Sequence, residues 1–299
     1  MKHINVSDSM PGSYEHYFLG DFHFFVIGHP TNKVKRLIRK ICSKKNATVS
    51  IGGDVIDGMQ LQDPRFKLGQ YSGKFERAEA QVHEAVKVLE PLTGRVKWVL
   101  HGNHELRVWN IMDVAKKIAR QLQCTCYEED LTYNDKVHSV MQIKADFGSC
   151  RVLNGHWEWY VNSWANDDYI CYENERRSLK KRLCKVGGVD DCEVAVAHHI
   201  HKIHAIPPSS PQFMKTVSKH ERLKAVYPTP TKKWIDQKRG LYYYDRDDRW
   251  YGSSGGFMPS YVEGFSTYAE RKGYKPTEMG CVKMVVKNDK LVGLEGVIM

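Results

Sequence analysis

Five short apolar runs, each ending at a polar turn, constrain the fold of this 299-residue chain more than any other feature. The runs occupy residues 16–20, 47–53, 96–100, 150–154 and 192–197. Their length and their boundaries at Gly, Asn or polar residues are typical of buried strands. Apolar residues at helical spacing separate the first three runs and predict helices over 34–41 and 82–89. Alternating strands and helices favour βαβ units with a parallel central sheet.

The rest of the chain shows a different pattern. Two more helices are expected over 111–122 and 174–185, and two strands joined around Asn288-Asp289 are expected within 281–299. Residues 206–280 are crowded with Pro, Gly, Ser and Tyr, and we interpret them as an inserted loop region or Tyr-rich cap. The length of the chain suits one large domain with such an insertion. The predicted units are a core over 1–205, an insertion over 206–280 and terminal strands over 281–299.

Composition and charge disfavour some classes of protein and leave others open. No apolar run is long enough to cross a bilayer, the N-terminus lacks the apolar segment of a secretory signal, and the eight cysteines include no CxxC pair. These features predict a cytoplasmic protein with reduced thiols and no membrane partner. The net charge of +10 favours acidic partners such as nucleic acid or nucleotides, although solvated Lys-rich helix faces give the same count. The oligomeric state is left open.

Asp, Asn and His side chains follow every one of the five runs. In order, they are Asp21 and His23; Asp54 and Asp57; Asn103, His104 and Glu105; His156; and His198, His199 and His201. Ligands of open α/β sheets gather at the carboxyl ends of the strands. Alone, His156 is explained as a core or surface histidine and Asp57 as a turn residue. The ordered series predicts a metal site, because Asp, Asn and His suit Mn²⁺, Fe or Zn²⁺.

The ordered motifs resemble those of the calcineurin-like metallophosphoesterases over residues 21–201. They are Asp21-Phe22-His23, Gly53-Asp54-x-x-Asp57-Gly58, Gly102-Asn103-His104-Glu105, His156 and His199-x-His201. The resemblance implies a four-layer α/β/β/α sandwich with two mixed sheets, and a hydrolase of phosphoesters. One position departs from the family pattern, because His198 occupies a place where Gly usually precedes the paired histidines.

The resemblance also implies two divalent metal ions, with Mn²⁺ expected and Fe or Zn²⁺ as alternatives. By position, Asp54 would bridge the two ions. Asp21, His23 and His201 would complete one ion, and Asn103, His156 and His199 would complete the other. Two such ions can stabilise the attacking and leaving oxygens of an in-line displacement, in which a bridging hydroxide is the expected nucleophile.

Three residues of the third motif are candidates for a catalytic role. His104 is expected to protonate the leaving oxygen or to steady the phosphoryl oxygens. Glu105 either orients His104 or is a charge at a helix N-terminus. Arg107 either grips phosphate or is an exposed helix charge. Asp57 and His198 are expected to support the ligands from outside the coordination shell.

The substrate is less well indicated than the reaction. A phosphodiesterase, nuclease or nucleotide phosphatase is favoured, because residues 32–45 hold seven Lys or Arg and no acid. Residues 202–249 add eleven basic residues against five acidic ones, interleaved with aromatics. A Ser/Thr-type protein phosphatase is the alternative that the run GNHELR supports, although Gly58 stands where such enzymes usually have Arg. A non-catalytic scaffold of the same fold is the second alternative, which the complete ligand set disfavours.

Overall fold

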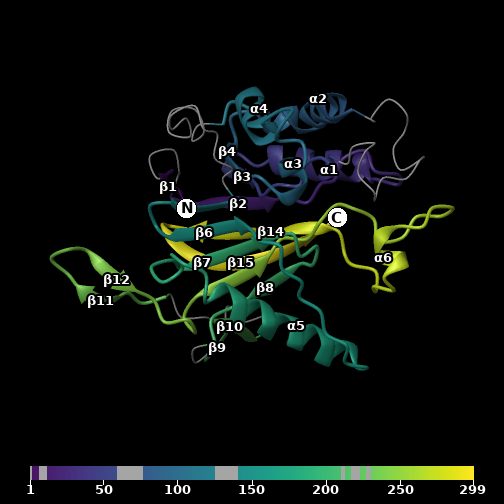
Figure 1. Ribbon diagram of the computed structural model, residues 1–299. Coiled ribbons are helices and arrows are strands. Elements are labelled where there is room, and N and C mark those ends of the chain that lie inside the picture. The colour runs from purple at the N-terminus through teal and green to yellow at the C-terminus, as the bar shows by residue number, and fades with distance from the viewer. Residues whose placement is uncertain are drawn as a thin grey trace.

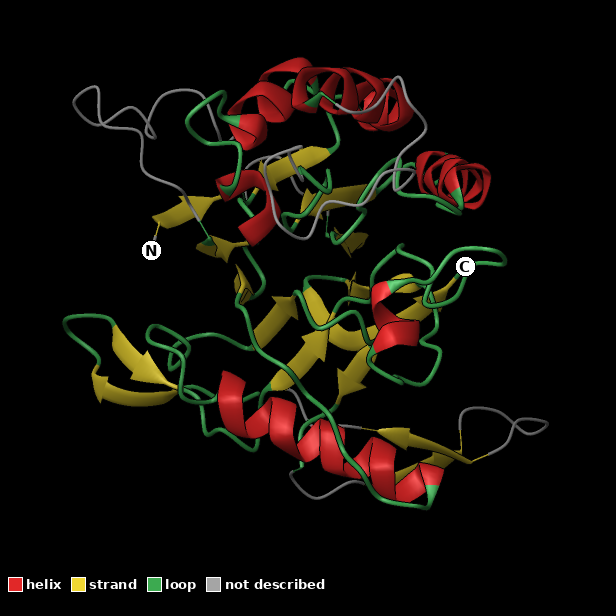
Figure 2. Cartoon of the chain, turned by 45° about the vertical axis from the view of Figure 1, so that its right-hand side comes forward, coloured by secondary structure: helices red, strands yellow, loops and turns green. Residues whose placement is uncertain are grey.

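The chain folds into four layers, with two β-sheets packed face to face between helices (Figure 1). Helices α1, α2 and α4 cover the outer face of one sheet, and α5 covers the outer face of the other (Figure 2). This confirms the expected four-layer sandwich with two mixed sheets. The computed structural model describes residues 2–6, 12–58, 77–124, 141–209, 213–216, 223–226 and 230–299.

The first sheet has five strands in the order β15-β14-β2-β3-β4. Its strands β2, β3 and β4 run parallel, and α1 and α2 connect them as βαβ units. The antiparallel pair β14 and β15 makes the sheet mixed, with Asn288 and Asp289 both at positive φ in the turn, as the sequence predicted. The elements are β2 (Tyr14–Leu19), α1 (Thr31–Cys42), β3 (Ala47–Ile51), α2 (Ala78–Leu89), η3 (Glu90–Leu92), β4 (Val96–Val99), β14 (Gly280–Lys287) and β15 (Lys290–Ile298).

The second sheet has six strands in the order β1-β5-β6-β7-β13-β8. Strands β6, β7 and β13 run parallel, and the sheet is mixed because β5 and β8 pair antiparallel with β6 and β13. The elements are β1 (Lys2–Asn5), β5 (Gln142–Asp146), β6 (Arg151–His156), β7 (Val194–His198), β8 (His204–Ile206) and β13 (Trp250–Ser253).

Strand β13 comes from the range 206–280 that the sequence assigned to an insertion, so part of this range belongs to the core sheet. Outside the sheets, the range forms two hairpins and the short helix α6, and the β11–β12 hairpin projects from the body (Figure 1). Residues 210–212, 217–222 and 227–229 lie outside the described residues, and the division into units stays a prediction. The elements are β9 (Phe213–Thr216), β10 (Leu223–Val226), β11 (Lys233–Asp236), β12 (Leu241–Tyr243) and α6 (Tyr268–Arg271).

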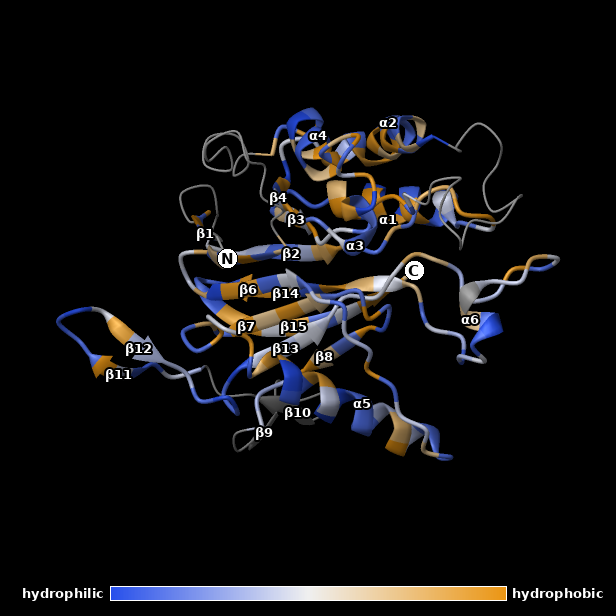
Figure 3. Ribbon diagram, in the orientation of Figure 1, coloured by the Kyte–Doolittle hydropathy of each residue, from blue (hydrophilic) through white to orange (hydrophobic). Residues whose placement is uncertain are grey.

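Three apolar clusters fill the three interfaces between the layers. The residues of α1 that the sequence predicted to be apolar lie in the first cluster, under the outer helices. α5 is mostly hydrophilic (Figure 3), and only Glu175, Leu179 and Leu183 of this helix are buried. It starts six residues before the predicted helix, because Asp167 caps it by accepting the N–H of Ile170 at 2.9 Å. The remaining helices are α3 (Asn103–Leu106), α4 (Val114–Gln121) and α5 (Asp168–Leu183).

A polar link crosses the apolar layer between the two sheets. The indole N–H of Trp98 on β4 donates to Oδ1 of Asn154 on β6 at 3.0 Å. Asn154 in turn donates to the carbonyl of Val196 on β7 at 3.0 Å. All three residues are buried, so each bond is protected from competition by water. Within the described residues, no helix has both the length and the apolar content that crossing a bilayer requires.

Candidate metal centre

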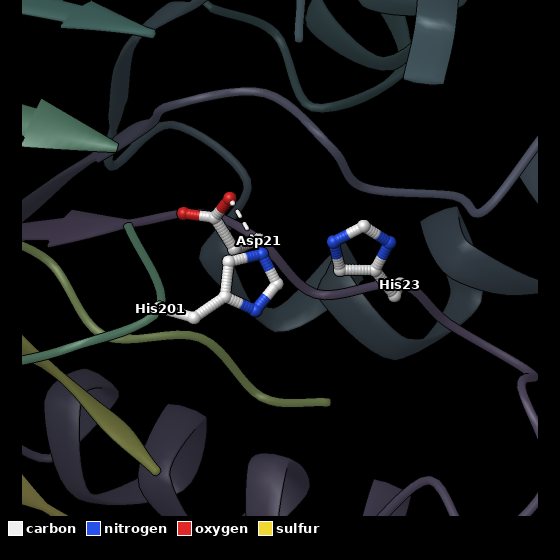
Figure 4. A group of neighbouring side chains, drawn as sticks. All are labelled: Asp21, His23 and His201. Atoms are coloured by element: carbon white, nitrogen blue, oxygen red, sulfur yellow. Dashed lines mark ion pairs between the residues drawn. The ribbon is translucent and has the colours of Figure 1, made fainter. Parts of the chain in front are cut away.

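The carboxyl ends of β2, β3, β4, β6 and β7 meet at one edge of the sandwich, and their loops carry the predicted ligands. The Asp and His side chains gather in three groups, and within each group the donor atoms lie within 4.8 Å of one another. Figure 4 shows the first group, in which His201 Nε2 lies 3.5 Å from Asp21 Oδ1. Two of the groups contain only predicted ligands: Asp21, His23 and His201, and Asp54, His156 and His199. The third group joins His23 to Asp57 and His104, which the resemblance placed outside the two ligand sets.

Asn103 adds a further oxygen beside the histidines of the second ligand set, and Asp54 lies between the two sets. Oδ1 of Asn103 lies 3.1 Å from Nε2 of His156 and 3.0 Å from Nδ1 of His199, so it faces the same point as both rings. Oδ2 of Asp54 lies 3.4 Å from Nε2 of His156 and 3.7 Å from Nε2 of His23. One carboxylate oxygen therefore faces a histidine from each group, as a ligand shared by two ions must.

Five of these seven residues have a backbone conformation in the left-handed region. The φ angles are 51° for Asp21, 47° for His23, 49° for Asp54, 76° for His199 and 56° for His201. Such a conformation costs a non-glycine residue about 1–3 kcal/mol and clusters at functional sites. Bonds between the loops impose it: the N–H of Asp21 donates to Gly53 and that of His23 to Asp54, at 2.9 and 3.0 Å. The loops thus fix the directions of the ligands.

The electrostatics of the cluster favour a bound cation. Burial raises the pKa of Asp21, but His201 and His198 outweigh this and lower it to about 2. Burial lowers the pKa of His156, but the Asp54 carboxylate outweighs this and raises it to about 10. Within the described residues, Asp54 Oδ2 and both ring nitrogens of His23 have no hydrogen-bond partner. Because metal ions and protons compete for the same lone pairs, this donor set fits divalent ions.

The family model of the calcineurin-like phosphoesterases matches residues 17–248, which span all seven of these side chains. The chain belongs to this family. It is therefore a hydrolase of phosphoesters, as the motifs predicted, and the family binds divalent metals. The match extends beyond residues 21–201, on which the resemblance rested, and ends at residue 248, just before β13. No curated protein has a significant match to this phosphoesterase.

Several solved structures resemble the phosphoesterase at low sequence identity. Vacuolar protein sorting 29 from Cryptosporidium parvum is 11% identical, with 97% of this chain and 100% of that chain covered and a TM-score of 0.38. A metallophosphoesterase from Sphaerobacter thermophilus is 10% identical, with 95% and 88% covered and a TM-score of 0.35. A phosphatase from Mycoplasma pneumoniae is 13% identical, with 97% and 94% covered and a TM-score of 0.36. At these scores the likeness carries no argument about activity.

Glu105 of the phosphoesterase ties two ligand loops together. Its buried carboxylate accepts the N–H groups of Asp54 at 2.8 Å, Val55 at 2.7 Å and Gly102 at 2.8 Å. The last of these bonds caps α3, which agrees with a charge at a helix N-terminus. The structure shows these backbone bonds in place of the contact with His104 that was the other expectation. Glu105 therefore holds the backbone of the Asp54 loop against the start of α3.

His104 faces the centre with one ring nitrogen and the protein with the other. Its Nδ1 lies 2.6 Å from the carbonyl of Asp57 and 2.9 Å from Nη1 of Arg107, and its Nε2 lies 4.0 Å from Oδ2 of Asp54. Burial lowers the pKa of this imidazole, but Asp54 and then Asp57 outweigh it and raise the pKa to about 9. Arg107 is half-buried, so it is not the freely exposed helix charge of one expectation.

His198 lies beneath the ligand loops, where two glycines make room for its ring. A Cβ on Gly52 would lie 2.1 Å from this ring and one on Gly20 would lie 2.5 Å from it. The imidazole is fully buried, and its Nδ1 lies 3.7 Å from Oδ2 of Asp21. This role of Gly20 and Gly52 was not among the predictions from the sequence. The signal was present, since each of these glycines lies one or two residues before a ligand aspartate.

Gly52→Ala is expected to destabilise the metal-free protein by about 1–3 kcal/mol, because the added methyl group overpacks the His198 ring. His198→Ala in the same chain removes the clash, so the double variant should recover most of that loss. Urea unfolding of the two single variants and the double variant measures this coupling. Gly187→Ala is the matched control, since nothing lies within 4 Å of its Cβ position. An equal loss from Gly52→Ala with and without His198 would contradict the packing argument.

Proposed function

We propose that the chain hydrolyses phosphodiesters of nucleic acids or nucleotides, or nucleotide phosphate esters, with two divalent metal ions. The observation that carries the proposal is the pair of adjoining donor groups that face one Asp54 oxygen. Asp54 would bridge the ions, with Mn²⁺ expected first and Fe or Zn²⁺ as alternatives. Asp21, His23 and His201 would hold one ion, and Asn103, His156 and His199 the other. Bound there, the ions would supply Lewis-acid activation of the phosphoryl group and of water.

His104 is proposed to hold the proton that the leaving oxygen receives. Asp54 and Asp57 favour its protonated form, which is the form that a general acid needs. The bond from Nδ1 to the Asp57 carbonyl fixes the ring, so Nε2 is the nitrogen left to face the substrate. Nη1 of Arg107 lies 2.9 Å from the same Nδ1, and Arg107 is proposed to steady this end of the ring or to reach the phosphoryl oxygens.

The basic face of α1 supports a polyanionic substrate. Lys33, Lys35, Arg36, Arg39 and Lys40 are all exposed, and none forms an ion pair with a carboxylate of the described residues. Cations held apart from acids attract phosphates and raise the association rate of charged ligands. This charge, together with the metal centre, supports the proposal of a nucleotide or nucleic-acid substrate.

A protein phosphatase is the second candidate. The observation that favours it is the guanidinium of Arg107, which lies beside His104 at the centre. Gly58, at the place where that class usually has Arg, weighs against it, and its positive φ of 60° suits glycine. A non-catalytic scaffold is weakly supported, because seven donor side chains converge without a structural need for them.

The proposal is tested with manganese-loaded protein on a panel of substrates. The panel contains single- and double-stranded DNA, RNA, cyclic nucleotides, nucleoside monophosphates, a phosphopeptide, and an aryl phosphate monoester and diester. We expect turnover of the nucleic acids or nucleotides, with binding that weakens as salt rises. Turnover of the phosphopeptide alone would favour the second candidate. No turnover of any ester, with manganese and then with iron or zinc in its place, would favour the scaffold.

His104→Ala is expected to keep the metal content and to lower kcat by roughly 10²–10⁴-fold, because it removes the proton donor and leaves the ligands in place. Metal analysis and steady-state kinetics on the best substrate of the panel measure the two effects. His83→Ala, an exposed histidine on α2, is the matched control and should leave both unchanged. Loss of metal from His104→Ala would place this residue among the ligands.

A further inference from the structure

The segment that follows His156 places an aromatic ring at the edge of the metal centre. Trp157 and Trp159 stack on each other at 5.0 Å and pack against the apolar cluster under α5. Tyr160 differs from them, because its side chain is 60% exposed. Its ring centroid lies 5.7 Å from that of His199, one of the proposed ligands, in an edge-to-face arrangement. An exposed aromatic ring therefore borders the place where the phosphate is expected.

This segment is held in place. The Nζ of Lys202 donates to the carbonyl of Val161 and to Oδ1 of Asn162, both at 3.1 Å, and to Glu175 on α5 at 2.6 Å. Val161, next to Tyr160, is buried. Lys202 directly follows the proposed ligand His201, so the metal loop and the aromatic segment are fastened to each other. An ordered ring gives up little conformational freedom when a ligand covers it.

We propose that Tyr160 stacks on the base of a nucleotide whose phosphate lies at the metal centre. This inference rests on the proposed function and narrows its substrate class to esters that carry a nucleobase. Every base offers a π-face, so stacking tolerates any sequence. A phosphoserine or phosphothreonine ester has no ring to place there, whereas Tyr160 keeps most of its surface free and borders His199.

The test compares a thymidine dinucleotide with the same dinucleotide in which one base is absent. Tyr160→Ala is expected to raise KM for the intact dinucleotide by about 10-fold or more, since stacking on an aromatic side chain contributes that much per base. KM for the abasic compound and kcat for both should change little. Tyr160→Phe should behave as the wild type, because it keeps the ring. Tyr169→Ala, at the start of the outer helix α5, is the matched control for an exposed tyrosine.

A second arm needs no catalysis. Equilibrium dialysis with manganese-loaded protein compares thymidine monophosphate with deoxyribose 5-phosphate, and only the first should bind more weakly to Tyr160→Ala. Equal effects of this variant on both ligands, or none on either, would overturn the stacking inference. Turnover of esters with a binding arm that shows no base preference would overturn this inference and leave the proposed function standing. No turnover, with base-dependent binding intact, would overturn the proposed function alone.

Discussion

Asp54→Asn is expected to empty the metal centre and to abolish hydrolysis. The amide keeps the size of the side chain and the acceptor for the N–H of His104, which now donates to Asp54 Oδ1 at 2.9 Å. It loses the negative charge that faces His23, His104 and His156 and that two cations would share. The loss in metal affinity should exceed the roughly 10–100-fold that removal of an outer hydrogen-bond partner costs. Metal analysis after dialysis against a weak chelator measures it.

Asp113→Asn is the matched control for this change. Asp113 also pairs with a histidine, since its Oδ1 lies 2.9 Å from Nε2 of His101, and it caps α4. It belongs to neither donor group, so its amide variant should bind metal and hydrolyse esters like the wild type while losing some stability. Full metal content in Asp54→Asn would show that the two groups do not share this carboxylate.

Glu105→Gln is expected to destabilise the metal-free protein by about 1–3 kcal/mol or more. Both carboxylate oxygens accept backbone N–H groups: Oε2 those of Asp54 and Gly102, and Oε1 that of Val55. An amide in either orientation turns its NH₂ group toward at least one of these donors and leaves it unsatisfied in a buried site. Each such loss costs about 1–3 kcal/mol, and repulsion between the two donors adds to it. Urea unfolding in the presence of EDTA measures the change.

Glu79→Gln, on the exposed face of α2, controls for loss of one glutamate charge and should stay within about 0.5 kcal/mol of the wild type. The manganese-bound Glu105→Gln protein should also show weakened metal affinity, because the Asp54 loop is no longer held. A variant as stable as the wild type would mean that water satisfies these N–H groups, and the role assigned to Glu105 would be wrong.

The first sheet and the candidate donor residues could be predicted because short local stretches of sequence carry the signal for both. Each ligand loop follows a strand of four to six residues whose apolar content is clear, and parallel strands bring their carboxyl ends to one edge. The strands that escaped prediction lack this signal. β1 pairs with β5 across 141 residues, and β8 has only three residues, HAI. Their assignment depends on partners that are far along the chain.

The range 206–280 shows why composition did not reveal strand β13. Tyr and Gly crowd the sequence around β13, and this favoured a looped cap. In the structure, Tyr244 and Tyr251 are fully buried, and Tyr251 lies within the six-stranded sheet. The same residue types fill a sheet interior as well as a surface loop. The role of Glu105 was hidden for a related reason, since its partners are backbone groups about 50 residues away, which no side-chain pattern reveals.

The hydrogen bond between Trp98 and Asn154 has a consequence for chemistry that happens at the rim. The proposed ligands come from both halves of the sandwich. One half supplies Asp21, His23, Asp54 and Asn103, and the other supplies the three later histidines. Apolar contacts between the sheets have no preferred direction, whereas a hydrogen bond tolerates only a narrow range of distance and angle. This buried pair therefore helps to keep the two sheets in one relative position. A shift of one sheet against the other would separate the two sets of ligands and lower activity, even with every ligand unchanged.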